Sequence, residues 1–206
     1  MQTIEKIVTG ILLGAVAPIL CMLIGWWGTF SFLPDRLTFL AAGMGLLAGV
    51  LVDVVFLQKW VAGFYSMSLQ AWMAVYLFYS TGMFGFFMGV PVFNLALAVP
   101  AGFFMGSRLA RRNACQDEVR RMKRSTCVFT TGVLAVVCAA SAAVALFDPY
   151  TAANLQGMLR LPFEVTRGMV VGIILVGGTA LLLLQWAVTA RCFSAAYARR
   201  VNAAAA

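Results

Sequence analysis

Apolar residues follow one another along this chain in long runs, and the short segments between the runs hold nearly all the charges. A membrane-spanning helix needs about 20 apolar residues, and six runs approach or exceed that length. We expect spans at about 7–30, 37–57, 69–88, 92–107, 126–146 and 168–190. The pattern therefore predicts an all-α integral membrane protein, a compact bundle of six helices forming one domain over residues 1–202.

The third and fourth spans come from one stretch, because residues 69–107 carry no charge. Glycine and proline interrupt helices, so Gly89-Val90-Pro91 is the natural break within this stretch. The pentapeptide Gly-Phe-Phe-Met-Gly occurs on both sides of the break, at 85–89 and at 102–106. We expect a tight hairpin here. The repeat also admits an interpretation as a pair of half-helices of the kind that transporters use, or as chance in a chain rich in glycine and phenylalanine.

Three further segments complete the expected organisation. Residues 108–125 are strongly polar and read as a basic loop, and 147–167 form the longest loop on the opposite side. Within that outer loop, Pro149 and Pro162 bracket a short helix that lies along the membrane surface or covers a pocket. The last four residues, 203–206, are alanines and are expected to form a frayed tail.

The charges predict an orientation. Six spans place both termini on one side, and that side carries twelve of the fifteen lysines and arginines. The other three are Arg36, Arg160 and Arg167. Because cytoplasmic loops are enriched in Lys and Arg, we expect both termini in the cytoplasm. The expected location is the cytoplasmic membrane of a bacterium or an archaeon.

Composition supports the membrane assignment and limits the partners. The chain is 63% hydrophobic and 11% charged, with a net charge of +8. A net positive charge can indicate nucleic-acid binding, but here the charges sit in connections between apolar runs, so we expect no nucleic-acid partner. The basic segment from Arg108 to Arg124 should meet anionic lipid head groups, at about 1 kcal/mol per charge near the surface. It could equally dock a protein partner in the membrane or the cytoplasm.

The residues that commonly carry catalysis are missing or isolated. The chain has no histidine, and its five cysteines form no C-x-x-C pair. Neither Gly-x-Ser-x-Gly nor His-Glu-x-x-His occurs, and no two aspartates lie within about ten residues of each other, as clustered magnesium ligands would. We therefore expect no enzyme, no cofactor and no metal site.

Polar residues within or beside the spans are the candidates for ligand binding. Asp53 is the one acidic residue inside an apolar span, and an intramembrane carboxylate indicates a functional site. The alternative is that it reaches the interface or pairs with Lys59 or an arginine of 108–124. Asn94 either lines a pocket or makes a hydrogen bond between helices, as Gln185 can. The remaining ligand-binding candidates are Tyr79, Thr81, Glu164 and Arg167.

Small residues four apart allow helices to approach closely in lipid. The spacing Gly-x-x-x-Gly occurs at Gly10/Gly14, Gly45/Gly49, Gly85/Gly89, Gly102/Gly106 and Gly168/Gly172. We predict that these ten glycines pack helices within the bundle, or that some of them form a face for a partner.

Two functional hypotheses follow. Six spans in about 200 residues with both ends cytoplasmic is similar to the substrate-binding membrane subunits of vitamin-type energy-coupling transporters, in topology and size. In that comparison Gly10/Gly14 corresponds loosely to their docking face. The first hypothesis is a transport-type protein that binds or passes a small solute or ion, alone or as a subunit. The alternative is a non-catalytic subunit or assembly factor that binds partner proteins through small-residue helix faces.

Overall fold

The computed structural model describes residues 3–112, 114–160 and 162–205, and this part of the chain is 87% helical and contains no strand. The helical fold predicted from the sequence is confirmed. Its elements are α1 (Thr3–Gly14), α2 (Val16–Thr29), α3 (Asp35–Ala62), η1 (Phe64–Ser66), α4 (Leu69–Phe86), η2 (Pro91–Leu97), α5 (Ala98–Arg111), α6 (Gln116–Phe147), α7 (Thr151–Leu159) and α8 (Arg167–Ala205).

Five stretches of the described chain are long and apolar enough to cross a membrane. They are Glu5–Thr29, Asp35–Ala62, Pro91–Arg111, Gln116–Phe147 and Arg167–Asn202. Large apolar side chains on α3 and α8 are widely exposed, as suits contact with lipid. Helix α4, which corresponds to the predicted third span, is not among the five, and its apolar sequence is diluted by Gln70, Ser80 and Thr81. The sixth span thus stays a prediction.

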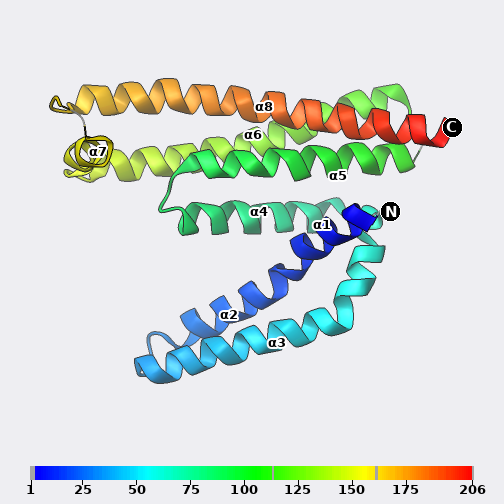
Figure 1. The fold of residues 1–206 in the computed structure, drawn as a ribbon, viewed down its shortest axis with the longest axis horizontal. Coiled ribbons are helices and arrows are strands. Elements are labelled where there is room, and N and C mark those ends of the chain that lie inside the picture. The colour runs from blue at the N-terminus through cyan, green and yellow to red at the C-terminus, as the bar shows by residue number, and fades with distance from the viewer. Residues whose placement is uncertain (1–2, 113, 161, 206) are drawn as a thin grey trace. The chain divides into compact units, whose positions relative to one another are not determined.

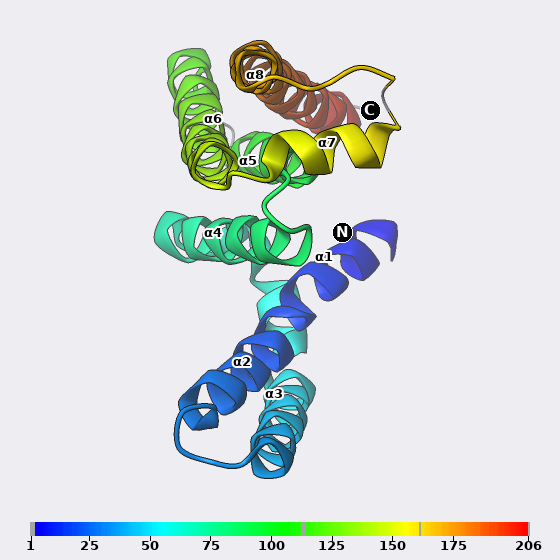
Figure 2. The ribbon, with the colours of Figure 1, turned by 90° about the vertical axis from the view of Figure 1, so that its left-hand side faces the viewer.

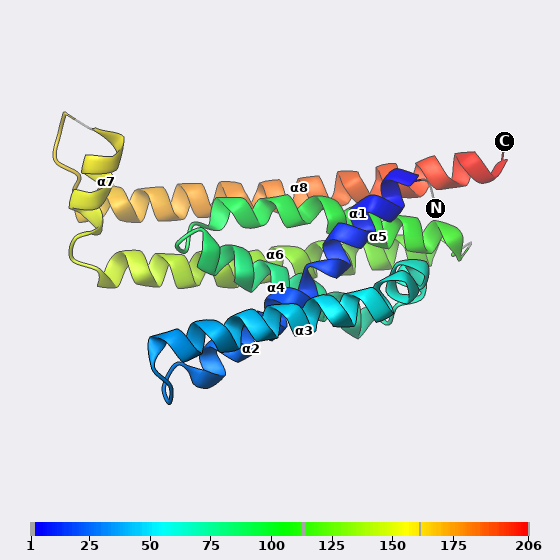
Figure 3. The same cartoon turned by 60° about the horizontal axis from the view of Figure 1, so that its bottom comes forward.

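The helices gather into two compact units, Met1–Val75 and Tyr76–Ala206. In the first unit, α2 and α3 form an antiparallel pair (Figure 3). The two helices are so close that a Cβ atom at Gly45 would overlap the backbone of Cys21, and one at Gly49 would overlap Pro18. Glycine at these two positions permits the contact. Helices α1 and α2 are separated at Ala15, three residues before Pro18, whose ring displaces the preceding turn.

In the second unit, α5, α6 and α8 lie side by side. The part of α4 from Tyr76 onward runs alongside α5 (Figure 1). Helix α5 is the most enclosed of them, with nine buried residues. A Cβ atom at Gly102 or Gly106 would overlap the α8 backbone at Thr189 or Phe193, so glycine permits this contact. The short helix α7 runs across the end of α6 and α8 (Figure 2).

The fourth predicted span differs from the expectation of one α-helix over 92–107. After α4 the chain turns through Met88 and Gly89, whose φ angles are 53° and 79°. It then continues as the 3₁₀ helix η2 before α5 begins. The physical reason is Pro100, which has no N–H and clashes with the carbonyl four residues earlier, so it is tolerated only in the first turn of an α-helix. An α-helix containing Pro100 therefore starts close to Ala98.

The predicted basic loop over 108–125 is largely helical. Helix α5 continues to Arg111 and α6 already begins at Gln116. Asp117 and Glu118 lie in the first turn of α6, where acidic side chains stabilise a helix N-terminus. The expected tail also differs, since α8 runs through Ala205; Ala206 lies outside the described residues.

Candidate functional site

A series of polar side chains lies buried inside the second unit, between α4, η2, α6 and α8. Its members are Ser80, Asn94, Tyr76, Gln185, Thr189 and Thr130, each at most 6% exposed, and we call them the polar line. Tyr76 and Ser80 are four residues apart on α4, so they lie on the same face of that helix. Both amides of the polar line, Asn94 of η2 and Gln185 of α8, form hydrogen bonds to this face of α4.

Asn94 forms hydrogen bonds to Ser80, one of the two α4 members of the polar line. Its Nδ2 donates to Ser80 Oγ at 2.8 Å and to the Ser80 carbonyl oxygen at 3.1 Å. Asn94 belongs to η2, so its position is set by the turn at Gly89 and the 3₁₀ segment that follows. The carbonyl acceptor fixes which amide atom faces Ser80. Asn94 Oδ1 therefore points elsewhere, and it has no hydrogen-bond partner among the described residues.

Gln185 forms a hydrogen bond to Tyr76, the other α4 member of the polar line. Its Nε2 donates to the Tyr76 hydroxyl at 3.2 Å, which joins α8 to α4. The Phe129 ring of α6 packs against the Tyr76 ring with centroids 5.4 Å apart. Gln185 is 0% exposed, and its Oε1 has no hydrogen-bond partner within the described chain. A second amide oxygen of the polar line is thus buried without a donor.

The polar line continues one turn further along α8. Thr189 and Thr130 are both 0% exposed, and their hydroxyl oxygens are 3.2 Å apart. Thr130 also donates to the Cys127 carbonyl at 3.3 Å, so Thr189 is the donor between the two hydroxyls. Because α5 contacts Thr189 at Gly102, the polar line leads toward the end of the unit that carries the α5 arginines.

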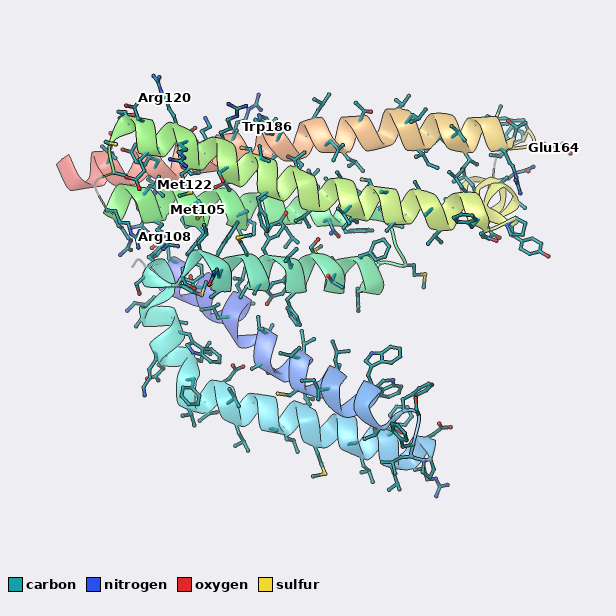
Figure 4. All side chains as sticks on the ribbon, turned by 180° about the vertical axis from the view of Figure 1, so that it is seen from behind. Met105, Arg108, Arg120, Met122, Glu164 and Trp186 are labelled. Atoms are coloured by element: carbon teal, nitrogen blue, oxygen red, sulfur yellow. The ribbon has the colours of Figure 1, made fainter. Side chains whose placement is uncertain are left out.

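That end is strongly basic. Figure 4 shows Met105, Arg108, Arg120 and Met122 near one end of the unit and Glu164 at the opposite end. Arg108 is only 8% exposed, and its guanidinium lies 5.9 Å from the centroid of the Phe104 ring. On the neighbouring helices, Lys123 Nζ donates to Ser194 Oγ at 2.8 Å.

The ligand-binding residues predicted from sequence lie on several different elements. Asn94 belongs to the polar line. Thr81 is exposed although its neighbour Ser80 is buried, and Tyr79 packs edge-on against Phe78 with ring centroids 5.5 Å apart. Glu164 and Arg167 are both exposed, the first between α7 and α8 and the second at the start of α8.

Asp53 lies in the first unit, on α3. It is partly buried, and its Oδ2 is 3.6 Å from the position a Cβ atom would take at Gly14 of α1. Its Oδ1 has no hydrogen-bond partner in the part of the chain that is described. The Lys59 ammonium lies 5.9 Å from the centroid of the Phe56 ring.

The ten glycines predicted to pack helices occupy different environments. Gly45, Gly49, Gly102 and Gly106 make the close backbone contacts described above, and Gly14 lies beside Leu57. Gly89 adopts a positive φ in the turn after α4. An added Cβ atom would meet no described atom within 4 Å at Gly10, Gly85 or Gly172, and only Thr166 at 3.8 Å at Gly168.

Four members of the polar line, Tyr76, Ser80, Thr130 and Thr189, are not among the residues predicted from sequence to bind a ligand or to join helices. A signal for them exists, because polar residues recur four apart within apolar stretches of three helices: Tyr76/Ser80, Thr126/Thr130 and Gln185/Thr189. This spacing places each pair on one helix face. A search for polar pairs at helical spacing would have found five of the six members of the polar line.

No charged side chain belongs to the polar line, so it offers hydrogen bonds but no ionic partner. The described residues contain no group of three or more His, Cys, Asp or Glu side chains placed to hold a metal ion. No protein-family model matches the chain, and neither a curated protein nor a solved structure matches it. The similarity to transporter subunits therefore rests on expected span number and size alone.

Proposed function

We propose that this is a transport-type membrane protein whose second unit binds or passes a small solute or ion, alone or as a subunit. The observation that carries the proposal is the polar line. Polar groups buried among apolar helices are costly when unpaired, at about 1–3 kcal/mol each, and intramembrane polar residues facing a bundle interior often mark solute pathways. Two of the six members keep an unpaired acceptor.

The interrupted element beside the polar line also supports the proposal. Transporters often place their binding sites where a membrane helix is discontinuous. Here the stretch Pro91–Arg111, long and apolar enough to cross a membrane, is a 3₁₀ helix as far as Leu97 and an α-helix from Ala98. Asn94 lies in that 3₁₀ segment, and its side chain bonds back to α4.

The test is solute flux in proteoliposomes. The purified full chain is reconstituted, and stopped-flow light scattering measures swelling for a panel of small neutral solutes, while dye assays measure ion entry. We expect at least one solute to enter faster than into protein-free vesicles, and Gln185→Leu to slow that entry. Gln70→Leu, an exposed glutamine on α4, is the matched control. Permeability equal to that of protein-free vesicles for every solute would contradict the proposal.

A second candidate is a non-catalytic subunit or assembly factor that binds a partner helix. Gly168 and Gly172 on α8 favour it, because neither meets a close neighbour in the described chain and large apolar side chains around them are exposed. Photocrosslinking from position 172 in native membranes tests this candidate. A crosslinked protein partner that is lost in Gly172→Leu would support it, and crosslinks to lipid alone would contradict it.

The proposal includes no catalytic step, cofactor or nucleic-acid partner. It places the chain in a cytoplasmic membrane with anionic lipid head groups against Arg108–Arg124. The support for this contact is the excess of positive charge in that segment, which has seven basic residues and only two acidic ones, Asp117 and Glu118. Anionic lipid should raise the melting temperature of the purified protein, and neutral lipid alone should not.

A further inference from the structure

We propose that Asn94 and Gln185 together form a binding site for a small uncharged solute that carries at least two hydrogen-bond donors. The inference rests on the proposed function and names the chemical class of its solute. Both side chains are at most 2% exposed, and both end in an amide oxygen without a donor. A buried carbonyl oxygen without a donor costs free energy, and a ligand donor recovers it.

The two amides leave acceptors free and use donors for the protein. Asn94 Nδ2 donates to two oxygens of Ser80, and Gln185 Nε2 donates to the Tyr76 hydroxyl. These hydrogen bonds use the nitrogen of each amide, and each oxygen is left without a donor in the described chain. A complementary ligand must therefore supply N–H or O–H groups.

The two amides bond to the same face of α4. Their partners Tyr76 and Ser80 lie one helical turn apart on the same face of α4, a separation of roughly 5–6 Å between Cβ atoms. Asn94 approaches this face from η2 and Gln185 from α8. The proposed ligand carries two donor groups because two acceptors, Asn94 Oδ1 and Gln185 Oε1, are left without a donor in the described chain.

The electrostatic environment selects an uncharged ligand. The polar line has no carboxylate to neutralise a cation and no guanidinium or ammonium to neutralise an anion. Two neutral amide oxygens cannot offset the cost of moving an isolated ion from water into such a low-dielectric interior. The Phe129 ring packs against Tyr76, so the surroundings of this partner of Gln185 are apolar, which suits the carbon skeleton of a diol or a primary amide.

The test measures binding at equilibrium rather than flux. The melting temperature of the full chain in detergent is recorded with increasing acetamide and, separately, with N,N-dimethylacetamide, which keeps the carbonyl but has no donor. Propane-1,3-diol and 1,3-dimethoxypropane form a second pair. We expect the donor-bearing member to raise the melting temperature by about 2–4 °C more than its partner when its concentration is roughly five times the dissociation constant.

Substitutions locate the effect. The difference within each solute pair should disappear in Asn94→Leu and in Gln185→Met, which keep side-chain volume but remove the amide. It should persist in Asn154→Leu, because Asn154 is exposed on α7. Equal melting temperatures with and without donor groups in the unmodified protein would overturn the proposal, and that comparison requires no variant to fold. A difference that persists in both site variants would also overturn it.

The outcomes separate this inference from the proposed function. Donor-dependent stabilisation in a protein that passes no solute would retain the amide site and remove the transport role. Solute flux that is unchanged in Asn94→Leu and Gln185→Met would retain transport and remove the site.

Discussion

At the scale of single residues, neutral hydrogen bonds between helices distinguish the interior of the second unit. Each bond joins side chains from different helices: Asn94 to Ser80, Gln185 to Tyr76, and Thr189 to Thr130. Such bonds inside membrane proteins contribute only about 0.6 kcal/mol on average. The polar line is therefore worth little as an adhesive, and its two unpaired oxygens make it worth less.

Thr130→Val tests that magnitude. Valine matches threonine in shape and removes the hydroxyl that contacts Thr189, so we expect a loss of stability of about 0.5–1.5 kcal/mol. Thr131→Val is the control for the change in residue type at the adjacent, partly buried position. Denaturant or thermal unfolding in a fixed detergent measures both variants. A loss above about 3 kcal/mol would mean that the hydroxyl supports a larger network.

Sequence could identify Asn94 but not its neighbours. An asparagine in an uncharged apolar stretch is conspicuous, whereas Ser80 and Thr81 are adjacent small polar residues, and only the phase of α4 decides which is buried. That phase depends on where the helix packs, which no local pattern states. The same uncertainty applies to the tyrosines of α4: the sequence prediction names Tyr79, and the buried tyrosine that contacts Gln185 is Tyr76.

At the scale of elements, the backbone contacts of glycine set which helices can touch. The α2–α3 and α5–α8 pairs both contain glycines whose replacement would overlap the partner backbone. The spacing Gly-x-x-x-Gly predicted these positions and others, such as Gly10 and Gly172, where an added Cβ atom meets no described atom within 4 Å. Spacing identifies a helix face but not what covers it. The division between η2 and α5 was likewise missed, although Pro100 carried the signal.

Gly102→Leu and Gly85→Leu form a matched pair within the repeated pentapeptide. Leucine at Gly102 would collide with the α8 backbone at Thr189, whereas leucine at Gly85 meets no described atom at its Cβ position. We expect Gly102→Leu to lower the melting temperature by more than 5 °C or to prevent folding, as overpacking does. Gly85→Leu should change it by less than about 2 °C. Size-exclusion profiles and melting curves in detergent measure both, and equal effects would contradict the α5–α8 contact.

Gly89→Ala tests the turn between α4 and η2. The φ of 79° at Gly89 is unfavourable for any residue with a Cβ atom, at about 1–2 kcal/mol. We expect a destabilisation of that order in thermal unfolding. Gly82→Ala on α4, where an added Cβ meets no described atom, should instead be neutral or slightly stabilising. A neutral result at Gly89 would mean that the turn adopts another conformation.

At the scale of the whole molecule, topology follows from charge more than from packing. The excess of Lys and Arg in the segments at 108–124 and after residue 190 predicts a cytoplasmic location for them. This inference needs no contact between helices, which is why sequence alone could make it. The number of spans is a weaker inference, because six spans are predicted and five stretches of the described chain, α4 not among them, meet the length and composition of a span.

Cysteine labelling in intact cells tests the topology. A cysteine introduced as Asn154→Cys on α7 should react with a membrane-impermeant maleimide, and the native Cys115, which is exposed before α6, should react only after the cells are opened. Cys115→Ser in the same background provides the control for the native signal. Labelling of Cys115 alone in intact cells would mean that the orientation is inverted.

The length of α8 has a mechanical consequence. At 1.5 Å per residue its 39 residues extend for about 58 Å, nearly twice the thickness of the hydrocarbon core. Gln185 and Thr189 therefore share one uninterrupted rod with Arg199 and Arg200. No helix break separates the arginine-bearing end from the buried amide of Gln185, so a rotation of that end would turn the whole helix. A partner that binds the Arg199–Arg200 end of α8 would therefore act on the same continuous helix that carries the buried Gln185.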